Sequence, residues 1–414
     1  MIPETRAVIC RLCGAPVTTT FVDLGQTPLA NAYLRPDDLA RPEPRYPLHT
    51  LVCDGCLLVQ LEALVSPDEL FSDYAYFSSY SDSWVEHSRR FVESSLARLA
   101  LGPESLVVEV ASNDGYLLQH FVAAGVPVLG IEPARNIAQT AVARGVPTEA
   151  AFFGRATAEG LVGRGLTADL VVANNVLAHV PDLDDFVAGL ALVLEPSGVV
   201  SIEVPHLLRL IEDTQFDTIY HEHFSYFSLL TATRALGDHG LVVFDVEQLD
   251  THGGSLRIWS APEAAGREPT DRLGDVRRQE AEAGLDRIET YAGFGARVER
   301  CRRGVVEFLA AARADGRSVV AYGAAAKGNT LLNYCGVSPA DITFVADRSP
   351  EKQGRLLPGS HIPVVAPGRI AETKPDFVVI LPWNLRREIS TQLAEVTGWG
   401  GQFVTFVPDV AVWS

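Results

Sequence analysis

Lysine is nearly absent from this chain of 414 residues. It occurs only as Lys327, Lys352 and Lys374, so 31 of the 34 basic residues are arginine, a pattern that nucleotide bias in the source genome explains most simply. The 52 acidic residues outnumber the basic ones, and the formal charge is −18. Because a protein that binds nucleic acid through its phosphates needs a basic face, no nucleic-acid partner is expected.

Long hydrophobic runs and a targeting segment are missing as well. No uninterrupted apolar stretch reaches about 18 residues, so neither a membrane span nor a membrane partner is expected. The first 14 residues lack the charged and apolar regions of a signal peptide. The expected compartment is therefore the cytoplasm, where thiols stay reduced. The hydrophobic share of 47% is that of a globular protein, and the length predicts two or three domains.

Four of the six cysteines form two C-x-x-C pairs, Cys10 with Cys13 and Cys53 with Cys56, and 39 residues separate the pairs. Each pair presents two thiolates from one tight turn, which is the arrangement of a tetrahedral four-cysteine zinc site. A redox C-x-x-C is the alternative, but a redox motif needs no second copy. We expect a structural Zn²⁺ that performs no chemistry, since four thiolates leave no open position. The segment between the pairs must fold back or carry strands of its own.

From residue 84 onward, helix and buried-strand patterns alternate. Helices are predicted at 84–101 and 116–124, strands at 105–110, 126–131, 169–173 and 198–204, a hairpin at 241–249 and 256–261, and further helices within 263–303. The C-terminal part repeats the theme with strands at 318–322, 342–346 and 376–381 and a loop at 323–330 that opens a helix. We expect an α/β multidomain fold with a small zinc-binding domain at 1–70, a doubly wound Rossmann-like domain with a helical linker at 71–290, and a Rossmann-like domain at 291–414.

The loop after the first of these strands reads Glu109-Val-Ala-Ser-Asn-Asp-Gly115. A dinucleotide requires G-x-G-x-x-G so that its pyrophosphate can approach the backbone, and this loop offers only one glycine. Its carboxylates would repel a pyrophosphate but suit the sulfonium and ammonium groups of S-adenosylmethionine, which we expect in preference to NAD, with S-adenosylhomocysteine as product. Glu132, which ends the second strand, is expected on the ribose hydroxyls. The expected cofactor contacts are Glu109, Ser112, Asn113, Asp114, Gly115, Glu132, Asn174 and Asn175.

Five blocks that follow one another along the chain carry a specific resemblance. They are the cysteine pairs, the loop 109–115, Tyr220-His-Glu-His-Phe-Ser-Tyr-Phe-Ser228, His252-Gly-Gly-Ser255 and Gly323-Ala-Ala-Ala-Lys-Gly-Asn329. Together they span nearly the whole chain, which resembles the sugar C-methyltransferase family, the C-3 branching enzymes of deoxysugar biosynthesis for antibiotics.

The resemblance implies an activity and assigns the domains. The activity is methyl transfer from S-adenosylmethionine to C-3 of a dTDP-linked 4-keto-deoxysugar that bears a 3-hydroxyl or a 3-amine. Residues 71–290 are then the methyltransferase domain, and residues 291–414 bind the nucleotide sugar.

The segment Tyr220-His-Glu-His223 carries acid–base groups. Methylation of carbon requires removal of a proton α to a carbonyl, and histidine is suited to be that base near neutral pH. The resemblance implies that Tyr220, Glu222 and His223 face the sugar. His223 is the expected base, Glu222 orients it or holds a sugar hydroxyl or amine, and Tyr220 bonds the C-4 oxygen. These three positions cannot share one face of a strand or helix, so a turn or loop is predicted. The alternatives to a catalytic role for this segment are a second metal site and plain surface polarity.

An aromatic segment at residues 71–80 and a histidine after the 169–173 strand add candidates. The resemblance points to His179 as a polar group beside the sugar and to Tyr74 as a catalytic hydroxyl. Tyr76 is a further expected substrate contact. Packing of the aromatic segment against a neighbouring domain is the alternative.

Two glycine-rich turns complete the expected substrate contacts. His252, in the hairpin turn, either reaches the site or belongs to a simple turn. In the C-terminal part, a glycine-bounded loop at a helix N-terminus is a good anion cradle, so Lys327, Asn329 and the nearby Arg348 are expected to hold the sugar's diphosphate. The alternative is a Rossmann-like remnant that only packs.

Three functions from different classes stay open. The first is the sugar C-methyltransferase, the second a sugar O- or N-methyltransferase or an NAD-dependent sugar-nucleotide enzyme, and the third a non-catalytic scaffold that binds an S-adenosyl ligand. The expected partner is a small-molecule nucleotide sugar, and the chain is taken to act as a monomer.

Overall fold

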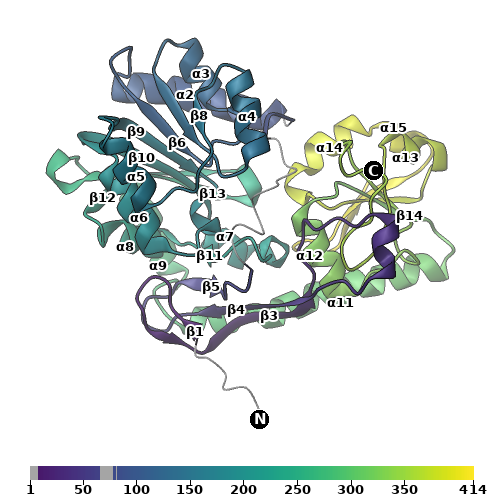
Figure 1. Cartoon of the computed structure of the whole chain (residues 1–414). Coiled ribbons are helices and arrows are strands. Elements are labelled where there is room, and N and C mark those ends of the chain that lie inside the picture. Colours follow the sequence, from purple (N-terminus) through teal and green to yellow (C-terminus); the bar gives the residue numbers. More distant parts are fainter. Residues whose placement is uncertain (1–7, 66–77, 81) are drawn as a thin grey trace.

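Three principal sheets form the architecture of the computed structural model, which describes residues 8–65, 78–80 and 82–414. Figure 1 shows the seven-stranded sheet and the C-terminal sheet side by side, with the N-terminal strands lying beneath both of them. Among the described residues, no helix is both long and apolar enough to cross a membrane.

The seven-stranded sheet has the strand order β12-β13-β10-β9-β6-β7-β8. Its strands are parallel except β13, which runs antiparallel to both neighbours. The strand order reverses at β6, whose neighbours are β7 and β9, so a ligand is expected beyond the carboxyl ends of these strands. The strands are β6 (Val107–Val110), β7 (Val128–Ile131), β8 (Thr148–Glu149), β9 (Ala168–Asn174), β10 (Leu194–Pro205), β12 (Leu241–Leu249) and β13 (Ser255–Pro262).

Helices cover both faces of this sheet. Successive residues of one strand enter different hydrophobic clusters: Val107 packs with α2 and α3, whereas Val108 packs with α5, α6 and α8. A sheet buried on both faces explains the nearly continuous apolar runs that predicted its strands, and the doubly wound prediction is confirmed. The helices are α2 (Asp82–Leu99), α3 (Leu118–Ala123), α4 (Arg135–Ala143), α5 (Arg155–Val162), α6 (Leu183–Leu192), α7 (Leu207–Glu212), α8 (Leu229–Gly237) and α9 (Asp271–Glu282).

The C-terminal sheet has the order β16-β15-β14-β17-β18-β19 and is parallel except at β19. Its strands are β14 (Val319–Tyr322), β15 (Val345–Ala346), β16 (Val364–Val365), β17 (Phe377–Ile380), β18 (Gln402–Thr405) and β19 (Ala411–Trp413). Its helices are α12 (Ala326–Cys335), α13 (Gly368–Thr373), α14 (Arg386–Gln392) and α15 (Glu395–Gly398).

One prediction for this sheet is wrong: the loop at 323–330 ends at Ala325, and α12 begins at Ala326. Lys327 and Asn329 therefore lie in the first turn of a helix. The first turn of α12 packs closely on the sheet, since a Cβ at Gly328 would lie 2.9 Å from the side chain of Leu381, which follows β17. Glycine serves here to bring the helix against the sheet.

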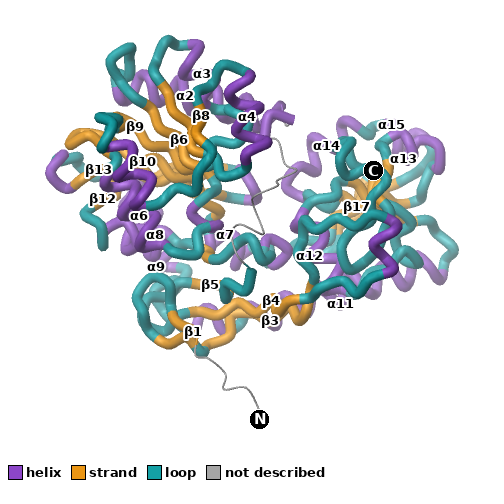
Figure 2. Tube along the Cα trace, in the orientation of Figure 1, coloured by secondary structure: helices purple, strands orange, loops and turns teal. Residues whose placement is uncertain are grey.

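The N-terminal residues form a small antiparallel sheet of β3 (Thr19–Thr27), β4 (Tyr46–Val52) and β5 (Val59–Leu61), beside the short pair β1 (Val8–Ile9) and β2 (Pro16–Val17). The prediction that the segment between the cysteine pairs carries strands is confirmed, as the orange strands at the base of Figure 2 show. The fourth strand of this sheet comes from elsewhere: β11 (Ser225–Tyr226) pairs with β5. Two residues that follow the segment 220–223 thus belong to the N-terminal sheet.

A long helix, α11 (Phe294–Ala314), follows the short α10 (Glu289–Ala292) and joins the three parts. The ring of Phe294 stacks on that of Phe21 in β3, with the ring centroids 4.4 Å apart. Buried side chains of β3, α7, α11, α12 and β14 share one hydrophobic cluster, so the N-terminal and C-terminal sheets share a core with the helix that follows β10.

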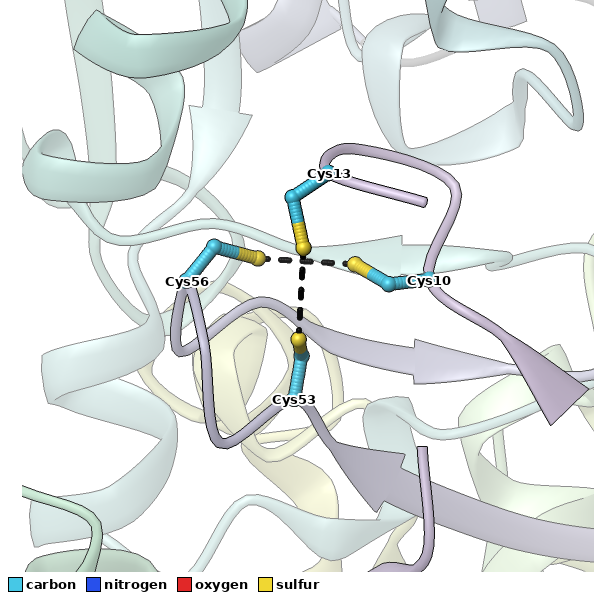
Figure 3. A group of neighbouring side chains, drawn as sticks. All are labelled: Cys10, Cys13, Cys53 and Cys56. Atoms are coloured by element: carbon cyan, nitrogen blue, oxygen red, sulfur yellow. Dashed lines mark hydrogen bonds between the residues drawn. The ribbon is translucent and has the colours of Figure 1, made fainter. Parts of the chain in front are cut away.

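The two C-x-x-C turns bring their four thiols together. The sulfur atoms of Cys10 and Cys56 lie 3.4 Å apart, those of Cys13 and Cys53 lie 3.5 Å apart, and all four are within 4.8 Å of one another. Figure 3 shows the four side chains pointing toward a common centre. Tetrahedral zinc, with Zn–S bonds of about 2.3 Å, places its ligand sulfurs about 3.8 Å apart. The donor set and its spacing therefore fit a structural zinc ion.

Replacing the buried thiol of Cys53 by the hydroxyl of serine should remove most of the bound zinc, because serine does not supply the thiolate. We expect less than one equivalent of zinc by plasma mass spectrometry. We also expect a melting temperature lower by roughly 5–10 °C, the shift that a few kcal/mol produces in a chain of this size. Cys335→Ser is the matched control, since Cys335 is buried in α12 outside the cluster; a normal zinc content in Cys53→Ser would contradict the assignment.

Candidate active site

The loop after β6 winds through a series of left-handed backbone conformations. Ala111, Asn113 and Gly115 have φ of 54°, 48° and 78°. At Gly115 a Cβ would lie 2.9 Å from the Val146 side chain, so glycine is required by both its conformation and its packing. The carboxylate of Glu132, which follows β7, accepts hydrogen bonds from the backbone N–H groups of Asn113 at 2.9 Å and Ala134 at 2.8 Å. This holds the loop beyond the carboxyl ends of β6 and β7.

Three buried carboxyl groups surround the loop. Burial raises the pKa of Glu109 well above its usual value, and the neighbouring charges of Glu132 and Asp114 add to that rise. Burial also raises the pKa of Glu132. Asp114 is paired with Arg144, whose Nη1 lies 2.7 Å from Oδ2. Together these groups create a site that favours a cation.

Several oxygen atoms at this edge of the sheet are buried and have no hydrogen-bond partner among the described residues. They are Glu109 Oε2, Ser112 Oγ, Asp114 Oδ1, Asn174 Oδ1 and Asn175 Oδ1. Buried acceptors without donors are costly, and a ligand rich in N–H and O–H groups would satisfy them. S-adenosylmethionine carries such groups on its ribose, adenine and ammonium, together with the positive charge that the carboxylates favour. The residues present therefore fit this cofactor.

The predicted turn is present at residues 220–223. The backbone N–H of His223 donates to the carbonyl of Tyr220 at 2.8 Å, which closes the turn. The rings of Tyr220 and His223 lie next to each other in this turn, with their centroids 4.0 Å apart and their planes tilted by 34°. The intervening His221 points away, and its Nε2 lies 3.2 Å from the Pro47 carbonyl of β4.

His223 is held as a neutral base. Its Nδ1 lies 2.8 Å from the carbonyl of Thr218, in the 3-10 turn η4 (Phe216–Thr218), and a carbonyl can only accept, so Nδ1 carries the proton. Nε2 is then the nitrogen with the free lone pair, and among the described residues nothing hydrogen-bonds it. Burial lowers the pKa of His223 well below its usual value, and His179 and Lys327 lower it further. The ring is therefore unprotonated at neutral pH.

Other aromatic and imidazole rings line the same place. His179 ends η3 (Leu177–His179) after β9, and its ring centroid is 4.7 Å from that of His223. Burial lowers the pKa of His179 to about 4. The centroid of Tyr226 lies 6.1 Å from that of His223. His223 therefore contacts the rings of Tyr220 and Tyr226 in its own segment and the ring of His179, which follows strand β9 of the seven-stranded sheet.

Glu222 does not orient His223, because the Thr218 carbonyl occupies the nitrogen that Glu222 would have held. Of the two roles expected for Glu222, contact with a ligand remains. Its carboxyl group is 4% exposed, and Oε1 accepts a hydrogen bond of 2.7 Å from Asn31 of the N-terminal part. Burial raises the pKa of Glu222 to about 7 while Asn31 opposes the rise, so the group changes charge near neutral pH.

The C-terminal part meets the same segment through Lys327. The Lys327 ammonium donates to Asn384 at 2.8 Å and lies 4.6 Å from the centre of the Trp383 ring. The Trp383 indole N–H in turn donates to Asp217 of η4 at 2.7 Å. Burial raises the pKa of Asp217 to about 6 against the opposing charge of Lys327. A single cation is therefore brought from the C-terminal sheet to the edge of the histidine cluster.

The hairpin turn places His252 near enough to His223 for the charge of His252 to lower the pKa of His223. His252 lies in η5 (Thr251–Gly253) with φ of 56°, and its ring contacts that of Trp84 at 5.1 Å. Burial lowers the pKa of His252 to about 4, with Lys327 the next cause. Trp84, the third residue of α2, also stacks on Tyr116 at 6.2 Å, beside the cofactor loop.

Two other expected substrate contacts have surroundings of their own. Arg348 is exposed. Asn329 is 1% exposed, and its amide donates to the Ala30 carbonyl at 2.6 Å, so it joins the C-terminal and N-terminal parts and is not presented to a diphosphate. Tyr74 and Tyr76 lie outside the described residues.

The residues that sequence reasoning missed are Asn31, Thr218, Asp217, Trp383 and Trp84. Asn31 and Glu222 are 191 positions apart, and Trp383 and Asp217 are 166 apart. No local pattern marks such pairs. Thr218 differs from these pairs, because it lies only five residues before His223 in the sequence.

Three protein-family models match successive parts of the chain. A model described as the C-methyltransferase C-terminal domain matches residues 250–408, a zinc binding domain model matches residues 10–71, and a methyltransferase domain model matches residues 84–246. The chain is 39% identical over 403 residues to C-methyltransferase NovU of Streptomyces niveus, covering 97% of this chain and 96% of that protein.

More distant similarities cover only part of the chain. A ubiquinone biosynthesis O-methyltransferase of Methylobacterium sp. (strain 4-46) is 33% identical over 107 residues, which is 24% of this chain and 42% of that protein. The crystal structure of magnesium protoporphyrin IX methyltransferase from Synechocystis PCC 6803 is 17% identical, with a TM-score of 0.33, and covers 44% of this chain and 82% of that chain.

The full-length relative and the three models, which follow one another along the chain, agree with the ordered motifs of the sequence. The chain belongs to the C-methyltransferase family.

Proposed function

We propose that this methyltransferase adds a methyl group to C-3 of a dTDP-linked 4-keto-deoxysugar, with His223 as the base. The observation that carries the proposal is the state of His223: a neutral ring with Nδ1–H bonded to Thr218 and Nε2 without a hydrogen-bond partner among the described residues. A base in this form removes a proton from carbon without first losing one of its own.

The reaction begins at the substrate. His223 Nε2 takes the proton from C-3, and the electron pair of the broken C–H bond moves into the C-3–C-4 bond while the C-4 carbonyl becomes an enolate. The Tyr220 hydroxyl donates to the C-4 oxygen and stabilises the charge that develops there. When bound, S-adenosylmethionine would supply an electrophilic methyl group, so that the bond to C-3 forms as the S–CH3 bond breaks and S-adenosylhomocysteine leaves.

The remaining groups bind and orient the sugar. Glu222 holds the 3-hydroxyl or 3-amine through the oxygen that Asn31 leaves free, and its negative charge stabilises the imidazolium of His223 once the proton has moved. His179 and His252 are neutral at pH 7 because burial lowers the pKa of each to about 4, so both offer hydrogen bonds without adding charge. Lys327 of the C-terminal part binds the diphosphate, since its charge acts on both His223 and His252.

Replacing His223 by glutamine should abolish exchange of the C-3 hydrogen with deuterated solvent. We expect a loss of roughly 10²–10⁴-fold, as for removal of a general base, with unchanged binding of S-adenosylmethionine. His221→Gln is the matched control, because His221 contacts Pro47 and lies outside the ring cluster. Mass and carbon NMR spectra of the product report the methylated atom. Normal exchange in His223→Gln would reject the base assignment, and a methyl group on oxygen or nitrogen would reject C-methylation.

The rate of C-3 exchange should rise with pH through about 7 and level off above it. Burial raises the pKa of Glu222 to about 7, and its ionised form is the one that stabilises the His223 imidazolium. The pKa of His223 itself is too low to produce this rising limb of the pH profile near pH 7. In Glu222→Gln the limb should vanish and the plateau rate should fall roughly tenfold, the loss expected for a hydrogen bond to a charged group. A limb near pH 7 that persists in Glu222→Gln would belong to another group.

The affinity for S-adenosylmethionine should increase with pH. Burial raises the pKa of Glu109 in the free protein, and a bound cation favours its ionised form, so binding should release a proton. Below the pKa of Glu109 the affinity should rise by up to about tenfold per pH unit. Calorimetry in buffers of different ionisation enthalpy measures the released proton. Glu109→Gln has no proton to lose and should bind with little pH dependence; equal proton release by both proteins would contradict this origin.

A further inference from the structure

The loop Ala30–Tyr33 of the N-terminal part is wedged between the other two parts. Asn329 of α12 donates to the Ala30 carbonyl at 2.6 Å, and the Tyr33 hydroxyl donates to the Ala324 carbonyl at 2.6 Å. The next residue, Leu34, pairs through its backbone with Leu356 of the C-terminal part. These contacts lie before and after Asn31 in the sequence and join the loop to the C-terminal part.

The side chain of Asn31 contacts the central part of the chain, at Glu222. Its amide N–H group donates to Glu222 Oε1 at 2.7 Å, across 191 positions of sequence. Glu222 belongs to the turn that carries His223, and its carboxyl group is 4% exposed. A buried carboxylate needs donors, and Asn31 supplies one of them while one oxygen remains for a ligand.

We propose that Asn31 is a positioning residue of the active site, so that the zinc-binding part of the chain completes the catalytic constellation by fixing the carboxyl group of Glu222. The inference rests on the proposed function, in which Glu222 binds the sugar and stabilises the protonated base. Asn31 acts through Glu222. It orients the carboxyl plane by occupying Oε1 and stabilises the ionised form by donating to it.

The groups around Glu222 define what Asn31 changes. Tyr33 lies close enough for the charge of Glu222 to raise the pKa of its hydroxyl, the ring of His179 bonds the backbone of Glu222, and His223 follows in the chain. His179 and His223 are neutral near pH 7 because burial lowers both of their pKa values. Burial raises the pKa of Glu222, and the Asn31 hydrogen bond opposes that rise. Loss of the donor should therefore raise this pKa.

The test compares pH profiles of C-3 deuterium exchange in Asn31→Leu, Asn31→Asp and the wild-type protein. In Asn31→Leu, the limb near pH 7 should move up by roughly one pH unit, the effect of losing one hydrogen bond to a charged group. Asn31→Asp keeps the size of the side chain and adds a like charge, so its shift should be at least as large. Tyr33→Phe is the matched control, because it removes the neighbouring contact with Ala324 and leaves Asn31 in place; its limb should stay at the wild-type pH.

A second measurement separates a path through Glu222 from general loosening of the loop. In the Glu222→Gln background, Asn31→Leu should change the exchange rate less than about twofold, because coupled residues are not additive. Melting temperature and zinc content show that each variant is folded. Absence of exchange in the wild-type protein overturns the proposed function. Exchange in the wild-type protein with an unmoved limb in both Asn31 variants, or with additive effects in the double variant, overturns the role of Asn31 alone.

Discussion

Hydrogen bonds from all three parts of the chain converge on the segment between Asp217 and Tyr226. The N-terminal sheet takes β11 as its fourth strand, Trp383 of the C-terminal part donates to Asp217, and Ala178, after β9, accepts from the backbone of Phe224. A turn of four residues has too few contacts of its own to hold two rings and a carboxyl group in fixed positions. The geometry of His223 therefore depends on the packing of the three parts around it.

The same convergence controls proton states. Burial of Glu222 and His223 between the parts moves the two pKa values in opposite directions, one up to about 7 and the other well below its usual value. An open site would leave a carboxylate and a partly protonated imidazole at neutral pH, an arrangement with less neutral base. Domain packing thereby supplies an unprotonated base and a carboxyl group poised to change charge.

The cysteine cluster influences this site at a distance. Arg11, between the first two cysteines, bonds the side chain of Gln60 in β5 and lies 5.5 Å from the ring centre of Phe224, the residue after His223. A metal bound by four thiolates would have no position for a substrate, so its contribution would be to fix the two turns that carry β5 and Arg11. The cysteine cluster, strand β5 and the turn of His223 are consecutive members of one packed unit.

The sequence by itself determined features whose cause is local: the spacing of the cysteine pairs, the buried strands of the doubly wound sheet, the carboxylate-rich loop after β6 and the turn at 220–223. Each leaves a pattern within a few residues, because each depends on backbone geometry or on charges close in sequence. Only the tertiary structure decided that Thr218 orients His223, that Asn31 meets Glu222 and that Asn329 joins two parts of the chain. Side-chain hydrogen bonds between distant segments impose no periodicity on either segment, so their partners are selected by how the sheets and helices pack.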